Sequence, residues 1–441
     1  MIKTRSIFLI LFICLLCFCS QKKDQQSGVV TLSFWHSFVS STIPALTDLI
    51  NKFEQENPGI KIRTQYVPTG EALIQKLITA IQSKTAPDIS WIHSFYMENL
   101  VKADAIYAMK DFINDPNGIT AEDLNDIYPP LIQMASWRNT MYSMPMEATN
   151  LALLYNKDMY RAAKLDPEKP PQDWDELYQF ARKLTLDTNN DGKFEQIGFF
   201  VPIYPAAGPQ GLWMVWQFSP FLWQAGGYMI DESQTKILYN SDAGVAALSL
   251  WKKMYDEFKL NMFTTDFDVA FASKHLAMAM DGPWSLPRYK ELMKNLDWAF
   301  APLPQGPHKK ATIIAGEFLA IFKQSSHPRE AWTFLKWMIR PDVQAFWAMK
   351  SGYLPIRRAV KNISEFQNYL QQEPNFRVFV DQLDVGEAER PMDFGGIEIQ
   401  QSLAEAIEKA TVGKMAVPIV LNEGVLKAQA VLDSYKQAAA K

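Results

Sequence analysis

The chain has 441 residues, of which 48% are hydrophobic and 21% are charged, and its formal net charge is -4. This length exceeds the size at which single hydrophobic cores stop growing, so we expect two domains or lobes. The slightly acidic balance excludes a surface built to follow a phosphate backbone, which needs an excess of Lys and Arg, and predicts no nucleic-acid partner.

Residues 1–19 have the pattern of a signal peptide for export. Two basic residues, Lys3 and Arg5, precede an apolar run over 7–18. A run of this length is typical of the hydrophobic region of a signal peptide and is too short to span a bilayer after cleavage. All three cysteines of the chain lie in this leader: Cys14, Cys17 and Cys19. The rest of the chain therefore has neither a disulfide nor a thiolate metal site.

The cysteines also indicate a lipid anchor. The stretch from Leu15 to Cys19 resembles a bacterial lipobox, with Leu16 three residues before Cys19. Phe18 departs from that pattern, because the residue before the lipidated cysteine is usually small. We predict lipidation at Cys19, with Cys17 or an uncleaved anchor helix as alternatives. The polar residues over 20–28 then form a short tether.

Residues 29–92 alternate between strand and helix patterns. β-rich segments predict strands over 29–35, 60–67 and 89–92, and apolar residues at helical spacing predict helices over 43–53 and 73–81. This order is typical of a parallel sheet covered by helices. Later in the chain we predict a helix capped by Asp173, a helix after Ser325 and a largely helical tail over 402–435.

Two predicted strands end in similar polar and aromatic residues. Trp-His-Ser occupies 35–37, and Trp-Ile-His-Ser occupies 91–94. In open parallel sheets, ligands bind beyond the carboxyl ends of the strands. A sugar needs such a mixture, because its C–H face is apolar and its hydroxyls must be paired when they are buried. We expect a ligand cleft at these ends. The alternative is that both tryptophans belong to the core.

The sequence lacks the motifs of nucleotide hydrolysis and of common hydrolases. It contains neither a Walker pattern nor G-x-G-x-x-G, and neither G-x-S-x-G nor H-E-x-x-H. We therefore predict no enzymatic activity and no cofactor. A carboxylate pair for glycoside hydrolysis stays open, because 48 acidic residues allow many such pairs.

One segment resembles the opening of a calcium-binding loop. Residues 187–195 read D-T-N-N-D-G-K-F-E, with Gly192 at the sixth position, where an EF-hand turns sharply. Gly198 stands at position twelve, where an EF-hand has a bidentate Glu. The same composition makes an Asx/Gly turn without an ion, before a predicted strand over 197–201. We favour the turn and predict no metal site.

Six fragments, in the same order over nearly the whole chain after the leader, resemble the family 1 extracellular solute-binding proteins, the sugar-binding components of ABC importers. They are FWHS at 34–37, APDI at 86–89, YNKDMY at 155–160, KLDPEKPPQDWDEL at 164–177, MDGPW at 280–284 and SGYLP at 351–355. Within the family, the chain is most similar to the glycerol-3-phosphate and maltose/trehalose binders.

The resemblance implies an α/β, two-lobed periplasmic-binding-protein fold, with discontinuous lobes joined by a hinge. The first lobe would hold 29–145, with 280–325 returning to it, and the second would hold 146–279 and 326–441. The protein would be lipid-anchored in the periplasm or on the outer face of the cytoplasmic membrane of a bacterium. It would close around a sugar and present it to ABC permease subunits in the membrane.

Within matching motifs, the resemblance implies these ligand-binding residues: Trp35, His36, Ser37, Trp91, Ser94, Glu147, Asp281, Trp284, Gly316, Glu317 and Tyr353. We predict that Trp284 stacks on a sugar ring, because the Gly-Pro turn before it would expose it; the alternative is a core position. Glu147 and Asp281 would accept hydrogen bonds from the hydroxyls.

The chain departs from the glycerol-phosphate pattern late in the sequence. The segment that would supply a phosphate-facing Arg reads D-F-G-G-I-E at 393–398, without a cation, although Arg390 lies just upstream. Carboxylates at Glu147 and Glu317 suit a neutral sugar better than a dianion. We therefore predict a neutral sugar, with glycerol 3-phosphate or a phosphodiester as the alternative. A lipoprotein glycosidase or a surface adhesin has less support.

Overall fold

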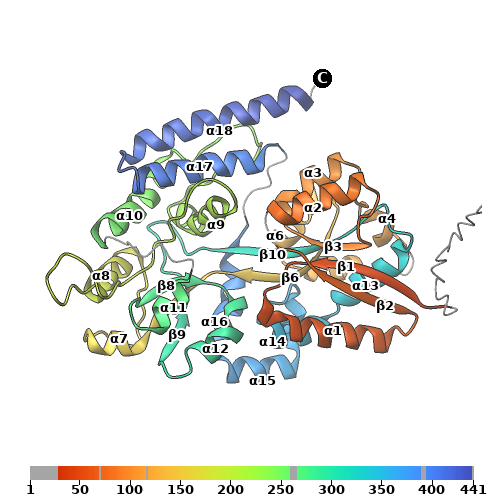
Figure 1. The fold of residues 1–441 in the computed structure, drawn as a ribbon, viewed down its shortest axis with the longest axis horizontal. Coiled ribbons are helices and arrows are strands. Elements are labelled where there is room, and N and C mark those ends of the chain that lie inside the picture. Colours follow the sequence, from red (N-terminus) through yellow and green to blue (C-terminus); the bar gives the residue numbers. More distant parts are fainter. Residues whose placement is uncertain (1–27, 69–70, 116–117, 259–265, 389–393, 440–441) are drawn as a thin grey trace, which may run out of the picture.

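The computed structural model of the protein describes residues 28–68, 71–115, 118–258, 266–388 and 394–439. Two lobes, each with its own sheet and surrounding helices, lie side by side and are joined by strands that run between them (Figure 1). This mixed α/β, two-lobed architecture confirms the predicted fold class. The predicted signal peptide and lipidation residue Cys19 lie outside the described residues, as does Arg390.

The first lobe is built on a six-stranded sheet of order β11-β10-β3-β1-β2, with β6 paired to β10. Its strands are β1 (Val30–His36), β2 (Ile60–Tyr66), β3 (Ile89–Ile92), β6 (Met144–Asn150), β10 (Thr312–Ile321) and β11 (Gly386–Glu387). β1 pairs in parallel with β2 and β3, which confirms the predicted parallel unit. β10 runs antiparallel to β3 and β6, so the sheet is completed from distant parts of the chain.

Helices pack against this sheet through their apolar faces. They are α1 (Ile43–Glu56), α2 (Glu71–Gln82), α3 (Met97–Lys102), α4 (Lys110–Ile113), α5 (Ala121–Asp126), α6 (Pro129–Met134), α13 (Pro328–Met338) and α14 (Pro341–Ser351), with short strands β4 (Ser136–Trp137) and β5 (Thr140–Met141) and 3-10 turns η1 (Ser40–Thr42) and η2 (Ser94–Tyr96). The ring of Phe334 in α13 lies 4.9 Å from that of Phe53 in α1 and 5.9 Å from that of Phe34 in β1. α1 and α13 therefore share one apolar layer against β1.

The second lobe has a three-stranded antiparallel sheet of order β8-β7-β9. Its strands are β7 (Ala152–Asn156), β8 (Met278–Asp281) and β9 (Trp298–Ala301). Its helices are α7 (Lys157–Ala162), α8 (Trp174–Leu184), α9 (Pro209–Gln224), α10 (Asp242–Phe258), α11 (Phe267–Ala272), α12 (Leu286–Leu292), α17 (Gly396–Thr411) and α18 (Val417–Ala439), with η3 at Pro283–Ser285. Every residue of β7 and β8 is buried, which explains their continuous apolar runs.

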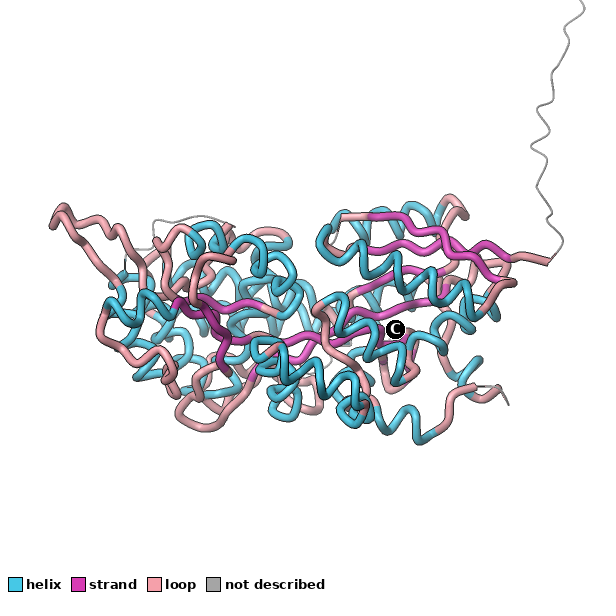
Figure 2. Tube along the Cα trace, turned by 90° about the horizontal axis from the view of Figure 1, so that it is seen from below, coloured by secondary structure: helices cyan, strands magenta, loops and turns pink. Residues whose placement is uncertain are grey.

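The chain passes between the lobes through a tightly bonded crossing. β6 of the first sheet ends one residue before Leu151, and β7 of the second begins one residue after it. The Leu151 carbonyl accepts a hydrogen bond from Thr312 Oγ1 at 2.7 Å and one from Gln382 Nε2 at 3.2 Å. The remaining helices, η4 (Arg358–Asn362), α15 (Ser364–Gln372), α16 (Pro374–Gln382) and η5 (Leu383–Val385), lie in the segment before β11. Figure 2 shows strands running from one lobe into the other.

The pairing differs from the expected division of the chain between the lobes. Within 280–325, β10 joins the first sheet as expected, whereas β9 pairs with β7 of the second. Within 326–441, α17 and α18 contact α9 and α10 of the second lobe, whereas α13 and α14 contact β1, β10 and α1 of the first. The difference arises because the apolar face of α13 finds its partner in a layer formed by residues far earlier in the chain.

Three further expectations can be compared directly. Asp173 caps α8, since its side chain accepts a hydrogen bond from the Glu176 amide at 2.9 Å. The helical tail is present as two helices, α17 and α18. The prediction of a strand over 197–201 is wrong, because Ile197 makes only an isolated bridge to Leu276.

In the described part of the chain, no helix has both the length and the apolar character needed to cross a membrane.

Candidate functional site

Aromatic residues gather at the carboxyl ends of β1 and β3. The ring of Phe38 lies 5.5 Å from that of His36, 6.3 Å from Trp91, 5.3 Å from Trp347 and 6.1 Å from Tyr353. We call these five residues the strand-end cluster. All five are buried. The structure thus brings three of the predicted site residues together around Phe38, which the sequence analysis did not select.

The other residues of the Trp-His-Ser segment point elsewhere. Successive side chains of a strand face opposite sides of the sheet, so Trp35 and His36 cannot share one surface. Trp35 lies on the α2 side, where the Lys76 ammonium sits 4.5 Å from the indole centroid. Ser37 Oγ donates a hydrogen bond to the Val67 carbonyl at 2.8 Å. Ser37 therefore ties the ends of β1 and β2 together.

Two polar atoms of the strand-end cluster have no protein partner among the described residues. They are the indole nitrogen of Trp91 and Nδ1 of His36, both fully buried. A buried donor without a partner costs free energy, so such atoms commonly mark the place of a water or ligand. Burial lowers the pKa of His36 to about 4, which keeps this imidazole neutral at physiological pH. Ser94 is half-buried at the start of η2, two residues after β3.

Glu147 and Glu317 lie directly opposite each other on β6 and β10. Both are buried, and the Trp347 indole N–H donates to Glu147 Oε2 at 2.5 Å. The strands come this close because Gly316 has no side chain, since a Cβ there would lie 2.3 Å from the Glu147 carbonyl oxygen. Burial raises the pKa of Glu147 and of Glu317, and their mutual proximity raises that of Glu147 further.

Tyr353 lies beside the two carboxyl groups. Its ring stacks on Trp347 with a centroid distance of 6.4 Å and an interplanar angle of 11°. Burial raises the pKa of the Tyr353 hydroxyl, and the neighbouring carboxyl groups of Glu317 and Glu147 raise it further. The hydroxyl is therefore a neutral hydrogen-bonding group.

Three tryptophans form a second aromatic group, the tryptophan cluster, in the second lobe. Trp213 and Trp216 lie one turn apart on α9 and stack at 4.7 Å with an interplanar angle of 14°. Trp284 of η3 lies 6.0 Å from Trp213 and 6.2 Å from Trp216. Trp213 is 39% exposed and the other two are half-buried. Gly282 permits this arrangement, because a Cβ there would lie 1.9 Å from the Trp284 ring.

Asp281 lies at the end of β8, directly before this turn. It accepts hydrogen bonds from the Tyr289 hydroxyl, the Ser285 hydroxyl and the Gly282 backbone N–H. Burial raises the pKa of Asp281 to about 6, although these donors oppose the shift. Nearby, Asp268 forms an ion pair with Arg288 at 2.7 Å. Asp281 therefore holds η3 in place beneath Trp284.

The two aromatic groups meet where the lobes touch. Gly352, beside Tyr353, lies against Pro283, beside Trp284, and a Cβ at position 352 would be 2.7 Å from the Pro283 carbonyl oxygen. η3 also contacts β6, the strand that carries Glu147. We call this contact the lobe junction. It places the strand-end cluster, through Tyr353, next to the tryptophan cluster, through Trp284. Trp35 and Ser37 lie outside both clusters.

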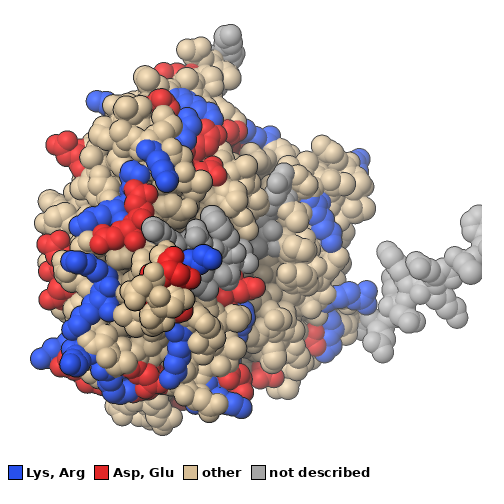
Figure 3. Space-filling view, turned by 60° about the vertical axis from the view of Figure 1, so that its left-hand side comes forward, with Lys and Arg blue, Asp and Glu red and all other residues tan. Residues whose placement is uncertain are grey.

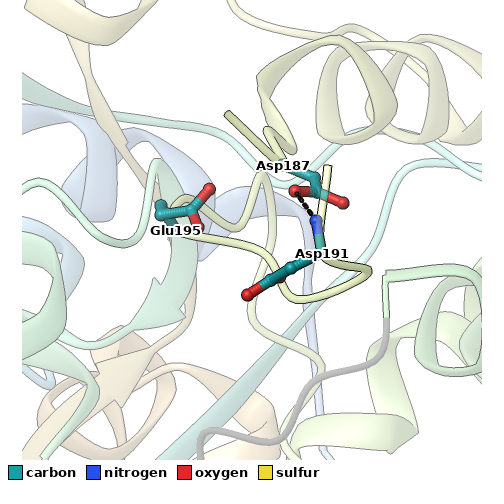
Figure 4. A group of neighbouring side chains, drawn as sticks. All are labelled: Asp187, Asp191 and Glu195. Carbon is teal, nitrogen blue, oxygen red and sulfur yellow. Dashed lines mark hydrogen bonds between the residues drawn. The ribbon is translucent and has the colours of Figure 1, made fainter. Parts of the chain in front are cut away.

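The acidic loop at 187–195 lies between α8 and α9. Carboxylate oxygens of Asp187, Asp191 and Glu195 lie within 4.8 Å of one another, and Figure 4 shows the three side chains around the loop. They accept backbone hydrogen bonds, including Gly192 N–H to Asp187 Oδ2 at 2.9 Å and Lys193 N–H to Asp191 Oδ1 at 2.8 Å. Such bonds are what an Asx turn makes without an ion, and the absence of a metal here stays a prediction.

Charges of both signs alternate on the face of the second lobe that Figure 3 shows. Elsewhere in this lobe, as the contacts themselves show, charges are paired, as in Lys157 with Glu168 at 2.8 Å and Lys252 with Asp256 at 2.7 Å. A face of this kind creates no extended positive field and does not favour a phosphate backbone.

Residues 40–345 match the family described as bacterial extracellular solute-binding protein. The chain belongs to this family. The membership confirms the resemblance stated from the sequence fragments and establishes a binding protein of extracellular location. It agrees with the geometry, since both aromatic groups lie where the two lobes of such a protein meet.

Sequence relatives share a quarter of their residues with this solute-binding protein. A Brucella abortus (strain 2308) chain named as a binding protein is 25% identical over 405 residues, which cover 90% of this chain and 91% of that one. The sn-glycerol-3-phosphate-binding periplasmic protein UgpB of Escherichia coli K12 is 25% identical over 365 residues, or 79% of each chain.

Solved structures show the same fold. A cyclic α-maltosyl-1,6-maltose binding protein from Arthrobacter globiformis superimposes with a TM-score of 0.78 at 24% identity, covering 92% of this chain and 100% of that one. A solute-binding protein from Thermotoga lettingae, bound to α-D-tagatose, has a TM-score of 0.76 at 22% identity, with 91% and 99% covered. The sugar-binding protein MalE from Xanthomonas citri has a TM-score of 0.75 at 21% identity, with 93% and 100% covered.

Sequence reasoning did not select Trp213, Trp216, Phe38 or Trp347. Trp213 and Trp216 lie at i, i+3 on a helix. Core residues of a helix have the same spacing, so this pattern does not distinguish a core tryptophan from a partly exposed one. The count of 13 tryptophans was the one available signal that some of them lie outside the core.

Proposed function

We propose that this solute-binding protein binds a neutral carbohydrate between its lobes and delivers it to an ABC importer. The tryptophan cluster carries the proposal. A partly exposed group of three indoles on a soluble protein is costly unless it meets a ligand, and indole faces match the apolar C–H faces of sugar rings. Its position at the lobe junction lets one ligand touch both lobes, which is what hinge closure requires.

The polar groups around the junction favour hydroxyls over phosphate. Tyr353, Trp91 and Ser94 offer neutral hydrogen-bonding groups, and Asp281 and Glu317 offer acceptors close by. Arg288 is engaged by Asp268. A dianion would meet carboxyl groups rather than free cations here, whereas sugar hydroxyls can donate to them. The sugar-binding names of the structural relatives agree with this choice.

Glycerol 3-phosphate is the second candidate, because the relative UgpB, named as a glycerol-3-phosphate-binding protein, is 25% identical over 79% of this chain. Both candidates use the same fold and the same junction. They differ in the charge of the ligand, so a direct comparison of the two ligand classes separates them.

The delivery route follows from the family and from the leader. We propose that Cys19 carries a lipid that anchors the protein on the outer face of the bacterial cytoplasmic membrane or in the periplasm, where it meets permease subunits. The apolar run over 7–18 and Leu16, three residues before Cys19, support this anchor. The anchor keeps the protein near its permease and raises the effective concentration of the pair.

The decisive experiment is calorimetric titration of the soluble protein with maltose, maltotriose, α-D-tagatose and sn-glycerol 3-phosphate. We expect saturable binding of at least one sugar and weaker binding of glycerol phosphate. Tighter binding of glycerol phosphate than of every sugar would replace the first candidate by the second. Recovery of the bound sugar unchanged, by chromatography, distinguishes a binding protein from a glycosidase.

A further inference from the structure

The carboxyl groups of Glu147 and Glu317 share one buried space. Residues directly opposite in an antiparallel pair have Cβ atoms about 5 Å apart, so two Glu side chains on one face meet at their carboxyl ends. Glu147 is 0% exposed and Glu317 is 9% exposed. The Trp347 indole uses Oε2 of Glu147. Oε1 of Glu147 and Oε2 of Glu317 have no protein donor in the part of the chain that the structure describes.

These two acceptors need a hydrogen between them. An ionised carboxylate only accepts hydrogen bonds, so two carboxylates side by side repel each other and leave their lone pairs unsatisfied. Two buried charges of one sign are costly, and a pair in this position ionises only once. A single proton converts the contact into an O–H···O⁻ hydrogen bond, which is among the strongest in proteins.

Among the described residues, the helices and strands packed around the pair offer no unpaired cation in its place. The buried Arg357, three residues after the bridge between Leu354 and Ala148 of β6, is paired with Asp123 and Asp126. The sequences of α6, α9, β3 and η3 contain no acidic or basic side chain. Arg329, Glu330, Lys336, Asp342, Lys350, Arg377 and Asp381 of α13, α14 and α16 are exposed or partly exposed. Glu387 of β11 is paired with Lys309 at 2.5 Å. Tyr353 is the titratable neighbour, and its pKa is raised by both carboxyl groups.

We propose that Glu147 and Glu317 share one proton at neutral pH and act as a positioning pair for the wall formed by Trp347 and Tyr353. The pair fixes Trp347 through the indole N–H, Trp347 fixes Tyr353 by stacking, and Tyr353 is next to the junction residue Gly352. The role replaces the direct ligand contact predicted for Glu147, which has no exposed surface. Only the consequence for binding rests on the proposed function.

The pH dependence has a definite sign. The folded protein raises the pKa of both carboxyl groups above their value in the unfolded chain, so it binds protons more strongly than the unfolded chain does. Stability from this source is fully present below the unfolded pKa and is lost as the pH rises through the folded pKa. The pair therefore makes a larger contribution to folding stability in a neutral or slightly acidic medium than in an alkaline one.

The test uses Glu147→Gln, Glu317→Gln, the double Gln variant and Glu147→Ala, with the exposed Glu365→Gln as a matched control. We expect the wild type and the control to show the infrared carbonyl band of a buried protonated carboxyl at about pH 7.5, and the double variant to lack it. The melting temperature should fall less between about pH 5 and pH 8 in the double variant than in the wild type. A wild type without the band, or a double variant that keeps it, overturns the shared proton.

The positioning role has its own readout, the affinity for maltotriose at neutral pH. Gln at position 147 can still accept from Trp347 and can donate to Glu317, so Glu147→Gln should keep the affinity within about twofold, whereas Glu147→Ala should lose about tenfold. Equal losses in both variants would show that the carboxyl group contacts the ligand directly. If the wild type binds no sugar of the panel, the proposed function fails, while the infrared and melting results still decide the shared proton.

Discussion

Gly352 and Pro283 hold the two lobes in direct backbone contact. Gly352 ends α14 of the first lobe with a φ of +84°, and a Cβ on it would lie 2.7 Å from the carbonyl oxygen of Pro283, which begins η3 of the second lobe. Both the left-handed backbone and the lack of space require glycine there. The strand-end cluster adjoins this contact through Tyr353, and the tryptophan cluster adjoins it through Trp284.

Gly352→Ala should therefore destabilise the protein for two reasons. Gly192 has the same φ of +84° with nothing within 4 Å of its Cβ position, so Gly192→Ala measures the backbone cost alone. We expect the free energy of unfolding to fall by about 1 kcal/mol in Gly192→Ala and by about 2–3 kcal/mol in Gly352→Ala, measured by thermal or denaturant unfolding. Equal losses of stability in the two variants would mean that the lobe junction accommodates the added methyl group at no cost in free energy.

Ligand binding should close the lobes. The crossing at Leu151 and the junction at Gly352 leave two lobes without a disulfide between them, so a hinge motion is open to them. Small-angle scattering of the protein with saturating sugar should give a smaller radius of gyration than the protein alone. An unchanged radius for a protein that calorimetry shows to be loaded would exclude closure as the mechanism.

Trp213→Ala should weaken sugar binding and leave the fold stable. Its indole is 39% exposed, so truncation leaves little cavity. We expect a loss of about 1–3 kcal/mol in binding, the range known for stacking of nucleic-acid bases on aromatic side chains. Trp251→Ala is the control, because Trp251 is fully buried in the same lobe and should instead lower stability by about 3–5 kcal/mol.

Trp284→Ala gives a second measure of the same surface. Trp284 is half-buried over Gly282 and against Trp213 and Trp216. Because part of its ring packs on the protein, we expect a binding loss of about 1–3 kcal/mol with a smaller loss of stability. A large fall in melting temperature with unchanged sugar affinity would assign Trp284 to the core.

Asp281→Asn should change how stability depends on pH. Burial raises the pKa of Asp281 to about 6 in the folded protein. Stability from this group is thus present below the unfolded pKa and lost as the pH rises through about 6. Between about pH 4 and pH 7, the free energy of unfolding should therefore fall by up to about 3 kcal/mol more in the wild type than in the Asn variant, as measured by denaturant unfolding. Parallel stability curves for the two proteins would contradict the raised pKa.

Cys19→Ser should release the protein from the membrane. Without the thiol, no lipid can be attached, so cell fractionation should find the variant in the soluble fraction. Release by Cys17→Ser instead would move the lipidation site by two residues. If neither substitution releases the protein, the leader acts in another way than as a lipobox.

The sequence alone determined those features that depend on neighbours along the chain. Alternating strand and helix patterns over 29–92 predicted the parallel unit β1–β2–β3, because periodicity is a local property. The N-cap of α8 by Asp173 was predictable for the same reason, because a cap depends on residues close together in the chain. The ordered family fragments then predicted the two-lobed fold that the structure shows.

Only the tertiary structure decided which side chains meet. Glu147 faces Glu317 because β6 and β10, far apart in the chain, pair in one particular register. Whether a carboxyl group is solvated or shares a proton depends on that pairing, since the free energy of a charge is set by what surrounds it in space. Likewise, helical spacing is the same for a core tryptophan and for Trp213. Only the packing of α9 against the rest of the lobe decides that the indole of Trp213 is partly exposed and lies beside Trp284.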